Sequence, residues 1–123
     1  DAQGADTAFG RVRGALLEFA AYYMTIREDL QIDWRIVLSS PLLIARDVEN
    51  DRHFEGAIAA ALGAQDGDTE TTRRHARVMA AAVFGAIRAV VLEWLHGGGE
   101  GDLVELGREA LDLIEAGIGR TRT

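Results

Sequence analysis

The sequence predicts an all-α domain of five helices. A single proline in 123 residues, together with many alanine, leucine and arginine residues, favours helix. Apolar residues recur every three or four positions along most of the chain, which is the period of an amphipathic helix, and no segment alternates as a strand does. With 48% hydrophobic and 27% charged residues, residues 1–123 have the length and composition of one globular domain.

Helical periodicity and end signals place the first three helices. Apolar residues repeat at helical spacing from Phe9 to Tyr23 and again from Leu30 to Leu38. Ser40 followed by Pro41 is typical of a helix start, because the hydroxyl caps the first turn and proline is tolerated there. These signals predict helices over residues 6–27, 28–39 and 41–62, and the polar stretch 49–53 is a candidate for a bend or break in the third.

Glycine clusters delimit the last two helices. The fourth is expected from residue 68 or 69 to residue 96, because Gly97–Gly99 follow it directly. Asp102 with Glu105 three residues later has the pattern of a capping box. A fifth helix is therefore expected from there, with an inner face that reaches Gly117 and a frayed tail at 119–123.

The segment Val78–Leu95 predicts a dimer. It is apolar almost all round, and a helix of that kind must be covered on several sides. Four other helices cover one or two of these sides, so a second subunit is the natural source of the rest. Arg88, Glu93 and several small residues interrupt the segment, which argues against a membrane span. A central helix wrapped by its own chain remains the alternative.

The predicted interface joins the last two helices of each subunit about a two-fold axis, as an intermolecular four-helix bundle. The residues expected there are Ala82, Gly85, Ala86, Ala89, Val90, Trp94, Leu103, Leu106, Ala110, Leu113 and Ile114.

Charge and composition exclude several classes of partner. The net charge is −7, and an acidic domain is poorly suited to binding a polyanion, so no nucleic acid is expected to bind this domain alone. Without cysteine no disulfide forms, which suits a reducing compartment. No basic-then-apolar leader is seen, so a cytoplasmic location is expected.

No motif indicates catalysis, a metal or a cofactor. The three histidines lie in separate segments, without the spacing of metal ligands. Asp47, Glu49 and Asp51 lack the glycine and terminal glutamate of a calcium-binding loop and are interpreted as a solvated acidic turn. No nucleophile elbow or phosphate-binding loop occurs. An enzyme is therefore not expected.

The order of features resembles the C-terminal domain of the TetR family of transcriptional regulators. The resemblance rests on Leu38–Leu42, Phe54–Leu62, Gly85–Leu95 and Asp102–Gly117, with a glycine-rich break before the last, and it covers nearly the whole chain. It implies a mostly apolar cavity for a small effector and pairing of the last two helices across a homodimer. It also implies N-terminal helix-turn-helix heads that bind DNA as a repressor. No such head precedes Asp6, so the chain is interpreted as the regulatory half alone.

Aromatic residues and methionines on inner helix faces are the candidate ligand contacts, since they supply area, a polar handle and an adaptable shape. A cavity is expected near Tyr23, Trp34 and Met79, although plain core is the alternative for each residue. The candidate ligand-binding residues are Phe19, Tyr22, Tyr23, Met24, Trp34, Met79, Val83 and Phe84.

Arg88 is a charge inside an apolar helix, where an unpaired cation is costly. The favoured interpretation is a structural ion pair with an acid such as Glu93 or Glu115. Two other interpretations are that the Arg88 side chain extends to the surface, or that it offers a cation to an acidic effector.

Three functions follow from these features. The leading one is a domain that dimerises and senses a small hydrophobic or aromatic effector, within a TetR-type repressor. A helical dimerisation module without ligand would share the dimer surface but have a filled core. A small helical enzyme would need a buried cluster of titratable groups.

Overall fold

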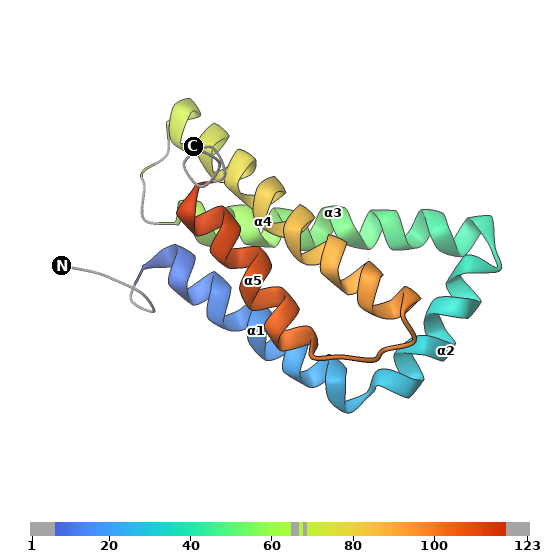
Figure 1. The fold of residues 1–123 in the computed structure, drawn as a ribbon. Helices are drawn as coiled ribbons and strands as arrows, with labels where there is room; N and C mark the ends of the chain where they lie inside the picture. The colour runs from blue at the N-terminus through green and yellow to red at the C-terminus, as the bar shows by residue number, and fades with distance from the viewer. Residues whose placement is uncertain (1–6, 65–66, 68, 118–123) are drawn as a thin grey trace.

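The computed structural model describes residues 7–64, 67 and 69–117, which form five α-helices and no strand (Figure 1). The all-α prediction is confirmed, and the five expected segments correspond one to one to the observed helices. The expected fraying of 119–123 lies outside the described residues. The helices are α1 (Ala8–Thr25), α2 (Arg27–Leu38), α3 (Pro41–Gly63), α4 (Glu70–His96) and α5 (Leu103–Ala116).

The helices enclose a triangle that is closed at one end and open at the other. In Figure 1, α1 and α3 diverge and α2 joins their separated ends. α4 packs along α3 and beside α5, and α5 packs in turn on α1. α2 contacts its neighbours more sparsely than these helices do and contains no buried residue. The molecule therefore has a densely packed end far from α2 and a looser end beside it.

Side-chain caps start α3 and α4 where the sequence predicts them. The Ser40 hydroxyl accepts a hydrogen bond from the Leu43 amide, and Pro41 occupies the first turn. Thr69 and Thr72 form a reciprocal capping box, in which each side chain accepts from the other residue's backbone N–H at 3.1 Å. These bonds satisfy amide groups that the helices themselves leave without partners.

α3 is one continuous helix, so the polar stretch 49–53 neither bends nor interrupts it. Glu49 lies 4.0 Å from both Arg52 and His53, at the i+3 and i+4 positions that share a helix surface. The polar residues are therefore accommodated on the flanks of an intact helix.

The closed end contains an aliphatic core built from four helices. Its centre is formed by Val83 and Leu111, whose side chains are inaccessible to solvent. Phe9, Leu17 and Ile114 pack around this centre. The buried members of the core are Val12, Leu16, Ile58, Leu62, Ala80, Val83 and Leu111.

A smaller cluster joins α1 to the connection between α4 and α5. Trp94 and Leu103 are buried there against Ala20. The Trp94 indole N–H donates to the Gly101 carbonyl at 3.3 Å, and Asp102 caps α5 by accepting from backbone amides of its first turn. This cluster fixes the start of α5 against the end of α4.

α4 is long and apolar enough to cross a membrane by length and composition alone, a test that the core helix of a water-soluble protein also passes. Only 17% of its apolar window is buried within the protomer. Much of α4 is therefore left uncovered by its own chain, as the two-sided apolar pattern predicts.

Candidate ligand-binding site

A partly enclosed cavity of about 380 Å³ lies at the open end of the triangle. Its walls come from α1, α2, α3 and α4, and Leu103 and Gly107 of α5 reach its base. Most of the wall is apolar, with aliphatic residues such as Leu30, Val37 and Val91 between the aromatic ones. This combination is typical of a small-molecule pocket.

Four aromatic rings form a continuous row in the lining of the cavity. The Phe19 ring lies 6.5 Å from Tyr23 and 5.8 Å from Phe54, and the Phe54 ring lies 5.7 Å from Phe84, measured between centroids. The Phe19 pairs meet edge to face, a favoured arrangement of aromatic quadrupoles. The row links α1, α3 and α4 across the cavity.

Trp34 adds a hydrogen-bond donor to the aromatic lining. Its ring is on the cavity wall and lies 6.2 Å from the His96 ring. The indole nitrogen is buried and has no hydrogen-bond partner among the described residues. A buried donor left without an acceptor is destabilising.

The polar part of the lining centres on Arg88 of α4. Its guanidinium lies 3.3 Å from Asp47 and 2.5 Å from Asp51, which are one turn apart on α3. Asn50 and Asp33 also line the cavity. The polar lining therefore combines three carboxylates, one amide and a single guanidinium.

Two pKa shifts report the local environment. Burial raises the pKa of the Asp51 carboxyl; Arg88 opposes this effect, and the charges of Asp47 and Glu55 add to it. Burial also raises the pKa of the Tyr23 hydroxyl, and the negative charges of Asp47 and Asp51 raise it further. Both groups are therefore biased toward their neutral forms beside an acidic wall.

The structure brings together half of the candidate ligand residues. Phe19, Tyr23, Trp34 and Phe84 line the cavity. For these four, contact with a ligand stays a prediction.

The other four candidates lie outside the cavity lining. Tyr22 is 57% exposed and Met79 is 40% exposed. Val83 is in the closed core, and Met24 packs with the smaller cluster, where its sulfur accepts from the Leu103 amide. The expected cavity near Tyr23 and Trp34 is present, but Met79 is not part of its wall.

The sequence interpretation of Asp47 and Asp51 as part of a solvated turn is wrong. Both residues lie within α3 and pair with Arg88. Their i, i+4 spacing places them on one helix face, and this spacing is the signal that could have identified them as partners for the half-buried Arg88. Phe54 lies on the cavity wall as well.

The ion-pair interpretation of Arg88 is confirmed, whereas the acids named for it are wrong. Glu115 contacts Arg13 of α1, and the pairs to Arg88 come from α3. Two carboxylates therefore compensate the charge of Arg88, which is half-buried within the apolar helix.

The residues predicted at a dimer interface divide by exposure. Gly85, Ala89 and Leu113 are exposed, with Leu113 at 54%, whereas Ala82, Ala86, Leu106 and Ile114 are half-buried. Trp94, Leu103 and Ala110 are buried inside the protomer, and half-buried Val90 lines the cavity. Only the exposed residues and the half-buried residues outside the cavity could contact a second subunit without a rearrangement of the protomer.

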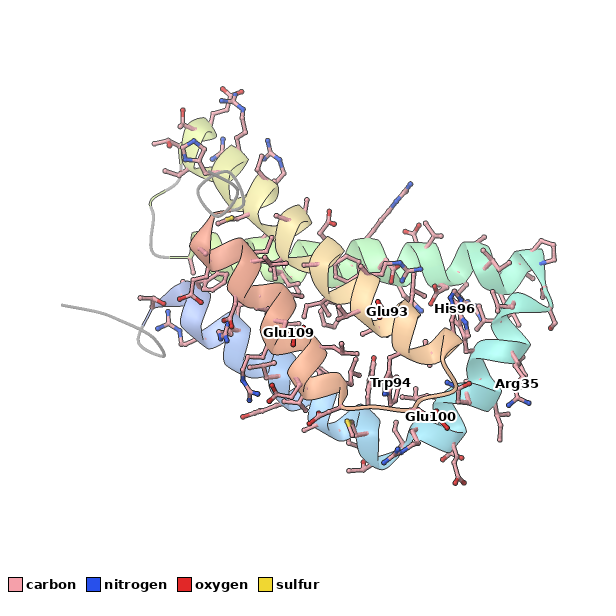
Figure 2. All side chains as sticks on the ribbon, in the orientation of Figure 1. Arg35, Glu93, Trp94, His96, Glu100 and Glu109 are labelled. Carbon is pink, nitrogen blue, oxygen red and sulfur yellow. The ribbon has the colours of Figure 1, made fainter. Side chains whose placement is uncertain are left out.

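Charged side chains border the apolar surface of α4 and α5. Glu93 of α4 and Glu109 of α5 are labelled in Figure 2, and both are exposed. α4 and α5 lie side by side, so their exposed small and apolar residues form one surface. Within the described part of the chain, no group of three or more histidine or acidic side chains is placed to hold a metal ion.

Comparison with known proteins identifies the class. Residues 7–119 match the family model described as the MftR C-terminal domain, a TetR-type regulatory domain. The chain therefore belongs to this family of TetR C-terminal domains, and the resemblance seen in the sequence is confirmed. No curated protein and no solved structure matches the chain significantly.

Proposed function

We propose that this domain senses a small, mostly hydrophobic effector and dimerises within a cytoplasmic TetR-type repressor. The cavity with its aromatic row is the observation that carries the proposal. Residues of all five helices line it, whereas a module without ligand would have a filled interior.

Binding in the cavity has a route to the rest of the protein. Phe19 and Tyr23 line it from α1, and Phe84 and Arg88 line it from α4. A ligand that separates these walls changes the angle between α1 and α4. Helix-turn-helix heads carried on the N-terminal side of α1 would then shift relative to each other on DNA, which couples effector to operator affinity.

A cavity-filling substitution tests ligand binding. Val37→Phe on α2 adds a ring to the cavity wall, and the neighbouring Ile36→Phe adds the same ring at an exposed position outside it. We expect isothermal titration with phenylhexanol to show about tenfold weaker binding for Val37→Phe, a loss of about 1.4 kcal/mol, and unchanged binding for Ile36→Phe.

Melting temperatures close to that of the wild-type chain would show that both variants fold. Equal affinities in the two variants, or no binding by the wild-type chain, would contradict an effector site and leave the ligand-free dimerisation module.

The uncovered surface of α4 and α5 supports the dimer. Val78, Gly85 and Ala89 of α4 are exposed, as is Leu113 of α5. Small residues allow two helices to approach closely, and four helices meeting about a two-fold axis would cover both apolar surfaces.

Matched charge insertions test this interface. Leu113→Glu places a carboxylate on the α5 surface, and Ile36→Glu does the same on α2 at nearly equal exposure, 54% and 52%. We expect analytical ultracentrifugation to give two-subunit mass for the wild-type chain and Ile36→Glu, and one-subunit mass for Leu113→Glu. A monomeric wild-type chain at micromolar concentration would refute the dimer.

A further inference from the structure

We propose that the effector carries a positively charged nitrogen on its apolar body, selected by the acidic part of the cavity wall. The inference rests on the proposed effector site and specifies the chemical class of its ligand. Three carboxylates, those of Asp33, Asp47 and Asp51, line the cavity against the single guanidinium of Arg88.

Arg88 is not free to receive an anion. Its guanidinium contacts both Asp47 and Asp51, at 3.3 Å and 2.5 Å, so its charge is already compensated twice. An anionic ligand would have to displace one of these carboxylates and would then lie beside the other. An excess of negative charge therefore remains at the wall after Arg88 is paired.

The aromatic row adds a second attraction for a cation. The rings of Tyr23, Phe19, Phe54 and Phe84 follow one another at 5.7–6.5 Å along the same cavity. Aromatic faces attract ammonium groups, and more strongly where water is partly excluded. Carboxylates beside aromatic rings are thus suited to a primary or quaternary ammonium attached to a hydrophobic group.

The protonation behaviour of the wall agrees with this assignment. The pKa values of Asp51 and Tyr23 are both raised, chiefly by burial, and neighbouring carboxylates contribute to each shift. A ligand cation placed between them would stabilise the ionised Asp51 carboxylate, so binding of a cation is expected to release protons near the carboxyl range.

Three probes that share a phenylhexyl body separate charge from apolar contact: phenylhexylammonium, phenylhexanol and phenylhexanoate. We expect titration calorimetry on the wild-type chain to give about tenfold tighter binding for the ammonium than for the alcohol, and the weakest binding for the carboxylate. Added salt should reduce the ammonium preference, because screening weakens charge attraction.

Two variants identify the wall as the source of the preference. Asp33→Asn removes an exposed carboxylate of the lining, and we expect the ratio of ammonium to alcohol affinity to fall about threefold. Glu109→Gln on α5, outside the lining, is the matched control and should keep the wild-type ratio. Arg88→Gln leaves the carboxylates uncompensated and should raise the ratio.

The outcomes distinguish the two proposals. Binding of phenylhexanol with equal or tighter binding of phenylhexanoate than of phenylhexylammonium would overturn the cation assignment and leave the effector site intact. Tighter binding of phenylhexanoate than of phenylhexanol by the wild-type chain, with that preference lost in Arg88→Gln, would instead assign Arg88 to an anionic ligand. Failure of all three probes to bind would overturn the effector site and the cation assignment together.

Discussion

The two ends of the helical triangle are held together by different interactions. At the closed end, Val83 and Leu111 are completely buried among aliphatic side chains. At the open end, α2 buries no residue: Leu30 packs against the Trp94–Leu103 cluster, Gln31 donates to the Leu95 carbonyl at 2.8 Å, and Arg27 donates to the Gly99 carbonyl at 3.4 Å.

This difference assigns folding stability mainly to the closed end and effector binding to the open end. Burial of aliphatic surface is the largest favourable term in folding, so the closed end carries most of the stability. The open end contains a cavity in place of close packing, so local unfolding there costs less free energy. A ligand that fills the cavity therefore adds contacts where the protein itself lacks them.

Shortening one leucine at each end compares the two directly. Leu111→Ala removes a fully buried side chain from the closed core and should lower the free energy of unfolding by about 2–5 kcal/mol. Leu30→Ala in the half-buried cavity wall should cost about 1 kcal/mol, because part of its surface is already unpacked. Urea denaturation of both variants measures the two values, and equal losses would contradict the contrast.

The ion pair between α3 and α4 ranks second in expected effect. Arg88→Gln leaves Asp47 and Asp51 without their cation and should lower stability at neutral pH by about 1–2 kcal/mol, since the groups are partly exposed. The deficit should shrink as the pH falls and the carboxylates become protonated. Denaturation curves at several pH values test this, and a deficit that grows on acidification would exclude the pairing.

Gly99 sets the turn to which α2 is tied. Its φ of +73° lies in the region that favours glycine, and an added Cβ would meet Arg27, Gln31 and Trp94 at 3.5–3.7 Å. We expect Gly99→Ala to lower stability by about 1 kcal/mol, mainly through backbone strain. Amide hydrogen exchange should accelerate in α2 while the closed core keeps its protection, and uniform acceleration would show that the ends are not separable.

The smallest expected effect is a pH trend at Asp51. Its folded pKa is raised above the ordinary 3.8, so the folded chain holds the proton more tightly than the unfolded chain. This group therefore favours folding most below pH 3.8, and its contribution is lost as the pH rises through the raised folded pKa. The stability of the wild-type chain relative to Asp51→Asn should fall across that window, and a rise would show that the pKa is lowered instead.

The helices and their starts could be predicted because their signals are local. Ser40 with Pro41, and Thr69 before α4, act on amides within the next turn of the same segment. The exclusion of a bend at 49–53 could not be predicted in the same way. Asp47 and Asp51 in this part of α3 pair with Arg88, which is far away in sequence, so local signals do not reveal the contact.

The sequence predicts that an apolar, aromatic cavity exists, but it identifies only some of the residues that line it. Helical periodicity identifies an inner face, and Tyr23 on that face of α1 does line the cavity. Periodicity does not tell which part of an inner face meets close packing and which meets a cavity. Val83 and Phe84 are neighbours on α4, yet one lies in the closed core and the other on the cavity wall.

Methyl NMR during titration with phenylhexanol tests the central claim most directly, because an uncharged probe reports the cavity independently of the cation assignment. The account predicts concentration-dependent shifts for the methyl groups of Leu30, Val37 and Val91, which line the cavity, and little change for Val12 and Ile58 in the closed core. Shifts confined to the closed core or the α4–α5 surface, or no shifts at all, would contradict it.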